Sequence, residues 1–302
     1  MRLFRAFRFL LVMVGYSLHM MWAGRALKAR AYNSFVATRQ RIAARKLIQG
    51  LRITTEVKGS VPEDLATLIS PNHIGALDPW IVASHFDVAF VAKAEMGTWP
   101  VIKTVTKAVA IIFAHRKNVM KTAETLNEIQ ERMRSGVSVL VFPEGTTSDG
   151  TDLLPFKTTG FQAIVGMEDG FVIPVYFHVR KINGEMVDIN SRKTVTWHSG
   201  QDMFENIWDL LDLGPLHYLI RIGSPIPAAG KNRKELAFET REAVRELMQQ
   251  ELREIVRPAT NGRGSTINVD TETSIRSASI EGALDSSLDY SKRNESHTVG
   301  TQ

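Results

Sequence analysis

The chain has 302 residues, 44% of them hydrophobic, which is enough to bury one sizeable core, alone or with appended segments. It contains no cysteine, which excludes disulfides, thiolate metal sites and a thiol acyl-enzyme and fits a reducing compartment. The formal net charge of +5 is unevenly spread, because residues 1–55 hold eleven Arg and Lys and no acidic residue. Since this basic excess flanks an apolar segment, it indicates anionic lipid as the partner and no nucleic acid.

The first predicted element is an apolar helix over residues 9–23, interrupted only by Tyr16, Ser17 and His19. Such a helix would be roughly 23 Å long, against about 30 Å for a bilayer core. Cations that follow the apolar run oppose translocation as a signal peptide. We favour a helix inserted into one leaflet, and a single spanning helix stays open. The basic residues on either side are Arg2, Arg5, Arg8, Arg25, Lys28 and Arg30.

A second, basic helix is predicted over residues 32–51. Its apolar side is formed by Val36, Ala43, Leu47 and Ile48, and its basic side by Arg39, Arg41, Arg45 and Lys46. This division suits the membrane interface, although an ordinary surface helix would show it too. We therefore predict that residues 1–52 are membrane-associated helices on the cytoplasmic face, which is the inner membrane if the source is bacterial.

From Ile53 onward, short apolar runs alternate with segments of helical spacing. This alternation predicts an α/β domain over residues 53–257, with a mixed sheet flanked by helices. The last helix is expected to start at Asn232, which has Glu235 three residues later as a capping box. Residues 258–302 are rich in Ser, Thr, Asn and Gly and are predicted to be a disordered tail. Strands are predicted at 65–69, 88–92, 108–114, 137–142, 171–175 and 217–222, and helices at 80–85, 99–106, 121–135 and 231–256.

The sequence Asn-His-Ile-Gly-Ala-Leu-Asp, residues 72–78, follows the first of these strands. Open α/β sheets place their chemistry at the carboxyl ends of strands. A carboxylate on one ring nitrogen fixes the tautomer of a histidine and stabilises the imidazolium that forms when it takes a proton. His73 and Asp78 are therefore the candidate base and its orienting partner, and a structural His beside an N-capping Asp is the alternative. No second His or Cys stands at ligand spacing from His73, so no metal is predicted.

Two further strand ends carry polar residues of complementary type. Arg116 follows the apolar run at 108–114, and Glu144-Gly145-Thr146 follows the run at 137–142. A guanidinium offers a planar donor fork that suits a phosphate, although a surface salt bridge is the alternative for Arg116. Glycine lets the backbone approach a ligand closely, and a carboxylate accepts hydrogen bonds from hydroxyl groups.

With these motifs the chain resembles the glycerolipid (lysophospholipid) acyltransferase family over residues 53–227. NHIGALD is similar to the first family motif, AIIFAHR to the second, FPEGTTS to the third and VIPV to the fourth. Lys157 and Gly160, in PFKTTG, match the Phe-Lys and Gly positions that follow the third motif. The second motif departs from the family pattern at Ala110 and at Ala114-His115, which makes the role of Arg116 less secure than that of His73.

The resemblance implies transfer of a fatty acyl group from an acyl thioester, either acyl-CoA or acyl-carrier protein, to the free hydroxyl of a lysolipid. The thioester is a co-substrate, and no bound cofactor is implied. The default acceptor is 1-acyl-glycerol-3-phosphate, giving phosphatidic acid; a lyso-amino-acid lipid or another lysophospholipid stays open. A serine nucleophile is not needed, because the acceptor's own hydroxyl attacks. A non-catalytic membrane-binding protein is the competing class, and it would be indifferent to changes at His73.

The resemblance also assigns the remaining site residues. It implies that Glu144, Gly145 and Thr146 help to bind the acceptor, with a purely structural turn as the alternative. Lys157 has two open interpretations, a contact with phosphate or an ordinary solvated lysine.

Overall fold

The computed structural model describes residues 2–23, 29–62, 67–98, 111–115, 119–197 and 202–256. Residues Met1–Gln249 form one compact unit, and a second unit spans Gln250–Gln302, of which 250–256 are described. The elements are α1 (Arg2–Ala23), α2 (Ala29–Gly50), β1 (Ile53–Lys58), β2 (Leu68–Pro71), α3 (Asp78–Ala83), β3 (Val88–Lys93), η1 (Ala94–Thr98), β4 (Ile111–Ala114), α5 (Val119–Arg134), β5 (Ser138–Leu140), η2 (Gly160–Ala163), β6 (Phe171–Ile182), β7 (Glu185–Met186), α6 (Ile189–Arg192), α7 (Met203–Leu210), β8 (Leu216–Ile222), β9 (Ile226–Pro227) and α8 (Arg233–Val256).

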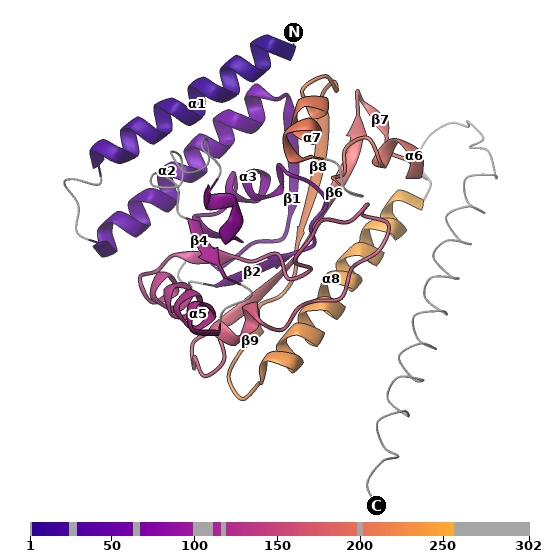
Figure 1. Cartoon of the computed structure of the whole chain (residues 1–302). Helices are drawn as coiled ribbons and strands as arrows, with labels where there is room; N and C mark the ends of the chain where they lie inside the picture. The colour runs from indigo at the N-terminus through magenta and orange to yellow at the C-terminus, as the bar shows by residue number, and fades with distance from the viewer. Residues whose placement is uncertain are drawn as a thin grey trace, which may run out of the picture. The chain divides into compact units, whose positions relative to one another are not determined.

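Apolar runs in the middle of the chain form a mixed sheet, as predicted. The strands pair in the order β1-β8-β6-β2-β5-β3-β4, with β7 and β9 paired to β6. The pairings of β6 with β2, β2 with β5, β5 with β3 and β3 with β4 are all parallel. Strand β8 runs antiparallel to β6 and pairs in parallel with β1. The carboxyl ends of five neighbouring strands therefore meet at one edge of the sheet (Figure 1).

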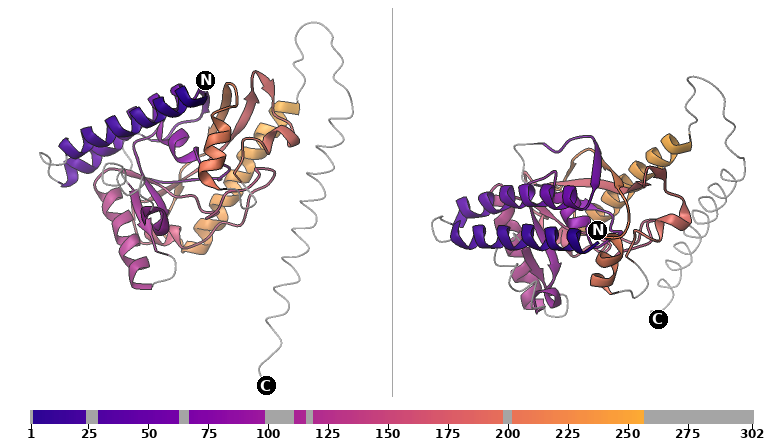
Figure 2. Two further views of the ribbon diagram at one scale, coloured as in Figure 1. Left: turned by 45° about the horizontal axis from the view of Figure 1, so that its top comes forward. Right: turned by 90° about the horizontal axis from the view of Figure 1, so that it is seen from above.

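Helices cover both faces of this sheet (Figures 1 and 2). On one face, Trp80 of α3 packs edge-on against Phe90 of β3, and α2 packs against α3, β1 and β3. On the opposite face, Gly160 of η2 lies against Val141, and α5 packs against η2, β4 and β5. Val244 of α8 lies on this second face too, in an apolar cluster with Tyr176. The result is a three-layer arrangement with the sheet in the middle.

The two amino-terminal helices lie side by side in all views and contact each other (Figures 1 and 2). Helix α2 is part of the core, since all four residues named above for its apolar side are less than 9% exposed: Val36, Ala43, Leu47 and Ile48. Its basic side is partly engaged by the protein, because Arg41 pairs with Asp87 and Arg45 donates to the carbonyl of Ser84. Two of the four basic residues thus help to fix the α3–β3 connection. An interfacial position for α2 stays a prediction.

Helix α1 begins at Arg2, earlier than the apolar run predicted, because its first turn is held by α7. Buried Arg5 donates through Nη1 to the carbonyls of Leu211 and Leu213, both at 2.7 Å, and Arg2 pairs with Asp209 and Asp212. The outer side of α1 is a stripe of apolar side chains, 46–76% exposed: Leu3, Phe4, Phe7, Leu10, Leu11, Val14 and Leu18. Among the described residues, no helix combines the length and the apolar character that crossing a bilayer requires.

The predicted α/β class is confirmed, and most element boundaries agree within a few residues. Strand β6 is longer than predicted, reaching Ile182, because it pairs with β8 far beyond the VIPV motif. Neither β1 nor α7 was predicted, since polar residues interrupt both segments. The capping box of α8 is present: Asn232 Oδ1 accepts from the amide of Lys234, and Glu235 Oε2 accepts from the amide of Asn232. The helix predicted at 99–106 and the disordered tail predicted at 258–302 lie outside the described residues.

Candidate active site

The candidate site lies where β2 and β5 end side by side. These strands pair in parallel, and the chain leaves them in opposite directions, from β2 towards β3 and from β5 towards β6. Such a switch point is where open α/β sheets open a crevice for ligands. The segment after β2 carries His73, and the segment after β5 carries Glu144. Two of the predicted strand ends are thus brought together by the topology.

Asn72 fixes the start of the first segment. Its side-chain amide donates to the carbonyl of Phe177 at 3.0 Å, and its Oδ1 accepts from the amide of Phe177 at 2.9 Å. The side chain replaces the next backbone pairing between β2 and β6, which ends at Pro71 and Val175. Because Asn72 is only 3% exposed, these bonds satisfy groups that would otherwise be buried without partners. His73 therefore leaves the sheet at a defined point.

The structure brings His73 and Asp78 into contact. His73 Nδ1 lies 2.7 Å from Asp78 Oδ2, and the same oxygen accepts from the amides of Ile74 and Gly75, also at 2.7 Å. Asp78 is fully buried, and an oxygen that accepts from two amides is an ionised acceptor. His73 Nδ1 therefore carries the hydrogen, and Nε2 is the nitrogen left to accept a proton. This is the geometry expected of a general base and its orienting carboxylate.

The backbone around His73 accepts hydrogen bonds from two later segments of the chain. The amide of Ser148 donates to the carbonyl of His73 at 2.9 Å, and the amide of Trp197 donates to the carbonyl of Ile74 at 2.8 Å. A Cβ on Gly75 would lie only 3.3 Å from Asp78 Oδ1, so a side chain there would crowd the carboxylate. Loop residues thus position His73 as firmly as a regular element would.

Phe142 is a residue of the site that sequence reasoning missed. Its ring stacks on the imidazole of His73, with centroids 4.0 Å apart and planes 20° from parallel. Stacking on the ring face limits rotation of the imidazole and favours a positive charge on it. Phe142 opens the FPEGTTS motif, but nothing local in the sequence shows that it faces a residue 69 positions earlier.

The turn after β5 separates the residues that were predicted to bind the acceptor. Gly145 has a φ of +70°, a conformation that glycine adopts more easily than other residues, which explains why glycine stands there. The preceding residue, Glu144, is only 2% exposed. Thr146 is exposed, and so is Lys157. A Cβ on Gly145 would lie 2.7 Å from Lys157 Nζ, so this ammonium sits over the turn. Thr146 and Lys157 line the outer side of the turn, while the Glu144 side chain lies beneath it.

The electrostatics of Glu144 follow from this position. The pKa of Glu144 is raised to about 8, chiefly because burial disfavours the charged form. Hydrogen bonds from the backbone amides of His73 and Leu154 oppose this rise, the charge of Asp78 adds to it, and the guanidinium of Arg241 opposes it. The Arg241 guanidinium donates hydrogen bonds to the carbonyls of Leu153 and Leu154, at 2.8 and 3.1 Å. At neutral pH this carboxyl group is therefore largely protonated.

The end of β4 lies further along the same edge. Strands β5 and β3 separate β4 from β2, which puts β4 roughly 14 Å from the His73 strand at about 4.8 Å per strand. The carbonyl of His115 accepts from Thr122 Oγ1 at 2.7 Å. Arg116 itself lies outside the described residues, so its predicted phosphate contact stays a prediction.

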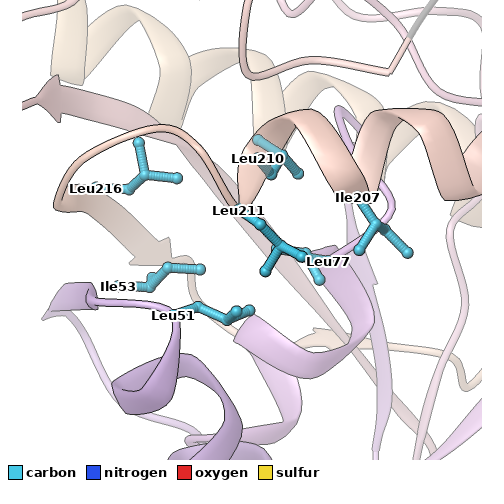
Figure 3. Close-up of a pocket in the computed structure, with 7 residues that line it drawn as sticks. All are labelled: Leu51, Ile53, Leu77, Ile207, Leu210, Leu211 and Leu216. Atoms are coloured by element: carbon cyan, nitrogen blue, oxygen red, sulfur yellow. The ribbon is translucent and has the colours of Figure 1, made fainter. Parts of the chain in front are cut away.

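A small apolar pocket lies beside the start of α3 (Figure 3). Leu77, next to Asp78 in the chain, packs there against Ile207 and Leu211 of the α7 segment. The space between these side chains does not admit a water molecule, so it is a packing contact that holds α3 in place. The full lining is Leu51, Ile53, Leu77, Ile207, Leu210, Leu211 and Leu216. Within the described part of the chain, no three His, Cys, Asp or Glu side chains gather as metal ligands would.

Comparisons with known proteins place the chain among acyltransferases. A family model described as Acyltransferase matches residues 52–178, which span His73, Asp78 and the turn at Glu144. A lyso-ornithine lipid O-acyltransferase from Brucella abortus is 32% identical over 70% of this chain and 80% of its own length. A lyso-ornithine lipid O-acyltransferase from Rhizobium meliloti is 29% identical over 72% of this chain and 76% of its own.

A third relative, a 1-acyl-sn-glycerol-3-phosphate acyltransferase from Neisseria meningitidis, is 32% identical over 40% of this chain and 48% of its own length. The crystal structure of the 1-acyl-sn-glycerophosphate (LPA) acyltransferase PlsC from Thermotoga maritima superposes with a TM-score of 0.62. It covers 88% of this chain and 96% of that chain at 20% identity, so this likeness concerns the fold.

This chain belongs to the acyltransferase family, and the predicted family is confirmed. It is an acyltransferase of the lysolipid-acylating kind.

Proposed function

We propose that the protein moves a fatty acyl group from an acyl thioester to the free hydroxyl of a lysolipid, with His73 as general base. The observation that carries this proposal is the His73–Asp78 contact at 2.7 Å, on a carboxylate that two backbone amides also bind. His73 Nε2 would take the hydroxyl proton as the oxygen attacks the thioester carbonyl. Collapse of the tetrahedral intermediate breaks the C–S bond, and the proton passes from His73 to the departing thiolate.

The acceptor we favour is a lyso-ornithine lipid. Two relatives with this name are 32% and 29% identical to the present chain over 70% and 72% of it. Relatives named for 1-acyl-sn-glycerol-3-phosphate are 32% identical over 40% of the chain or 26% identical over 60% of it. Higher identity combined with longer coverage supports the lyso-ornithine acceptor. An ornithine headgroup carries an amine and a carboxylate in place of a phosphate. A lyso-ornithine lipid is a lyso-amino-acid lipid, the alternative acceptor that the sequence motifs left open.

The second candidate acceptor is 1-acyl-glycerol-3-phosphate. Predicted phosphate ligands favour it, namely Arg116 after β4 and Lys157, whose ammonium lies over the Gly145 turn. If Arg116 grips a phosphate through two donors, Arg116→Lys should raise the KM for this acceptor more than the KM for the thioester. An unchanged acceptor KM would favour an acceptor that has no phosphate.

The test is a comparison of purified protein on both acceptors, each offered with acyl-CoA and with acyl-carrier protein. We expect kcat/KM for lyso-ornithine lipid to exceed that for 1-acyl-glycerol-3-phosphate by about tenfold or more, a difference of about 1.4 kcal/mol in transition-state binding. The reverse ranking would replace the favoured acceptor with the second. His73→Ala is the matched control, and product formation by that variant would show contamination or a different mechanism.

We also propose that α1 docks the enzyme on an anionic membrane surface at its cytoplasmic face. The support is the exposed apolar stripe of α1 together with the excess of Arg and Lys in residues 1–55. Apolar side chains would enter the leaflet, and each basic residue near an anionic surface adds about 1 kcal/mol, screened by salt. Removing residues 1–52 would also remove the buried side of α2, so surface variants make the cleaner test.

A triple variant of the stripe, Phe4→Ser, Phe7→Ser and Leu11→Ser, should lose most of its sedimentation with anionic liposomes. The control is Met120→Ser with Phe238→Ser, which removes two comparably exposed apolar side chains from α5 and α8. Quantitative binding of the triple variant at high salt would rule out docking through α1.

A further inference from the structure

Glu144 is placed unlike a residue that binds a substrate. It lies in the turn that follows β5, beside the exposed Thr146, yet its side chain is 2% exposed. Neither carboxyl oxygen has a hydrogen-bond partner of good geometry among the residues that the structure describes, and the backbone amides of His73 and Leu154 are the donors that act on the carboxyl group. These donors compensate an ionised carboxylate only partly for its desolvation. The geometry therefore favours the protonated form.

The surroundings of Glu144 come from three parts of the chain. The backbone amides of His73 and Leu154 act on the carboxyl group as hydrogen-bond donors and lower its pKa. Arg241 of α8 approaches it from the opposite face of the sheet to α3, and binds the carbonyls of Leu153 and Leu154. Asp78 is the other charged group that acts on it. The carboxyl group thus lies between the backbone of the catalytic loop and the backbone of the segment pinned by α8.

These same two stretches of backbone are already joined on the outer side of the turn. The amide of Ser148 donates to the carbonyl of His73, and the amide of Lys157 donates to the carbonyl of Pro143 at 2.8 Å. Arg192 Nη1 binds the carbonyl of Gly150 at 2.7 Å from another direction. The segment from 143 to 157 is therefore closed on itself and fastened to the His73 loop, with Glu144 filling the space beneath.

We propose that Glu144 is a positioning residue, whose buried carboxyl group sets the spacing between the His73 loop and the 149–157 segment instead of contacting the acceptor. The inference rests on the proposed acyl transfer, because the position being set is that of the His73 base. It replaces the role that the motif resemblance implies for Glu144, an acceptor of hydrogen bonds from the substrate. Thr146 and Lys157, on the outer side of the turn, are left as the residues of this segment that can meet the acceptor.

Two variants separate the roles kinetically. Glu144→Gln keeps the shape and an uncharged amide, so kcat and the acceptor KM should stay within about threefold of the wild type. Glu144→Ala leaves a gap beneath the loop, and a displaced base should cost about tenfold to a hundredfold in kcat with little change in the acceptor KM. The matched control is Glu168→Gln, a solvent-exposed glutamate in the η2–β6 connection, which should change neither. A rise of about tenfold or more in the acceptor KM of Glu144→Gln would overturn the proposal.

A stability measurement gives an answer that needs no activity. The carboxyl group has its folded pKa raised to about 8 from 4.5, so the folded state holds a proton that the unfolded state releases. Its contribution to stability is complete below pH 4.5 and is lost as the pH rises through about 8. Between these values the unfolding midpoint of the wild type should fall relative to that of Glu144→Gln. Parallel pH curves would overturn the buried, protonated role.

The outcomes also separate this inference from the proposed function. If the wild type acylates no lysolipid but shows the pH-dependent difference in stability, the acyl-transfer proposal fails and the buried placement of Glu144 stands. If the wild type is active and Glu144→Gln loses acceptor affinity, the acyl transfer stands and the positioning role fails. If Glu144→Ala does not fold, Glu144→Gln alone decides the matter.

Discussion

Asp78 and Glu144 are both buried carboxyl groups that follow neighbouring parallel strands, but the protein treats them in opposite ways. Asp78 Oδ2 accepts three hydrogen bonds at 2.7 Å, although Asp78 Oδ1 has no partner among the described residues. Neither oxygen of Glu144 has a hydrogen bond of comparable geometry within the described part of the chain, and only the amides of His73 and Leu154 act on it as donors. Burial alone therefore does not decide whether a carboxyl group is charged. The donors that surround it decide, because hydrogen bonds stabilise the ionised form and desolvation disfavours it.

The difference separates two tasks. The ionised Asp78 can orient the imidazole of His73 and stabilise its positive charge. A protonated Glu144 can do neither, but in the role proposed above it sets the spacing between backbone segments without a counter-ion. On these two proposals, one turn holds the base and the neighbouring turn sets the spacing around it.

The largest effect should come from making the same chemical change at both carboxyl groups. Asp78→Asn removes the charge that orients His73 and should lower kcat by roughly 10²–10⁴-fold. Glu144→Gln should leave kcat within about threefold, because the group it replaces is already neutral. Steady-state kinetics on both variants would measure this contrast. Equal losses at the two positions would show that both carboxyl groups act as charges and would break the comparison.

A smaller effect is expected where the His73 turn leaves the sheet. Asn72→Ala would leave the amide and the carbonyl of Phe177 without hydrogen-bond partners. A buried unsatisfied group costs about 1–3 kcal/mol of stability. Denaturant unfolding should show this loss, and kcat should fall as well, because His73 follows directly. Asn72→Asp keeps the acceptor for the Phe177 amide and serves as the matched variant. Undiminished stability in Asn72→Ala would mean that the side chain does not complete the sheet.

The smallest of these effects concerns the ring beneath the base. Phe142→Leu removes the stacked contact with the His73 imidazole at 4.0 Å but keeps an apolar side chain. Stacked aromatic pairs contribute about 0.5–1.5 kcal/mol, so kcat should fall by about two- to tenfold. Phe142→Tyr keeps the ring and should remain near the wild type. If Phe142→Leu is fully active, the stacking has no part in holding the imidazole.

Local patterns in the sequence were sufficient to predict that His73 and Asp78 are neighbours, and to predict most strands of the sheet. The spacing of His73 and Asp78 placed both in one turn, and the apolar runs identified β2, β3, β5 and the start of β6. The capping box predicted at Asn232 is confirmed for the same reason, because Glu235 is only three residues away. Each of these interactions is confined to a few neighbouring residues, whose conformations the sequence constrains directly.

Contacts between distant residues could not be predicted in this way. Asn72 bonds to Phe177, 105 positions away, and Phe142 stacks on His73, because strand pairing brings those segments together. The resemblance implies that Glu144 helps to bind the acceptor, but its side chain is buried beside the turn in which Gly145 has a φ of +70°. The orientation of one side chain in an irregular turn depends on distant segments such as the His73 loop, which no local pattern specifies.

The most direct test of the central claim, that His73 and Asp78 act as one catalytic unit, is kcat for the wild type, His73→Ala, Asp78→Asn and the double variant. Each single variant should lose roughly 10²–10⁴-fold while circular dichroism shows that it is folded. The double variant should lose far less than the product of the two single losses, because neither residue works without the other. Near-normal turnover of folded His73→Ala, or losses that multiply in the double variant, would contradict the account.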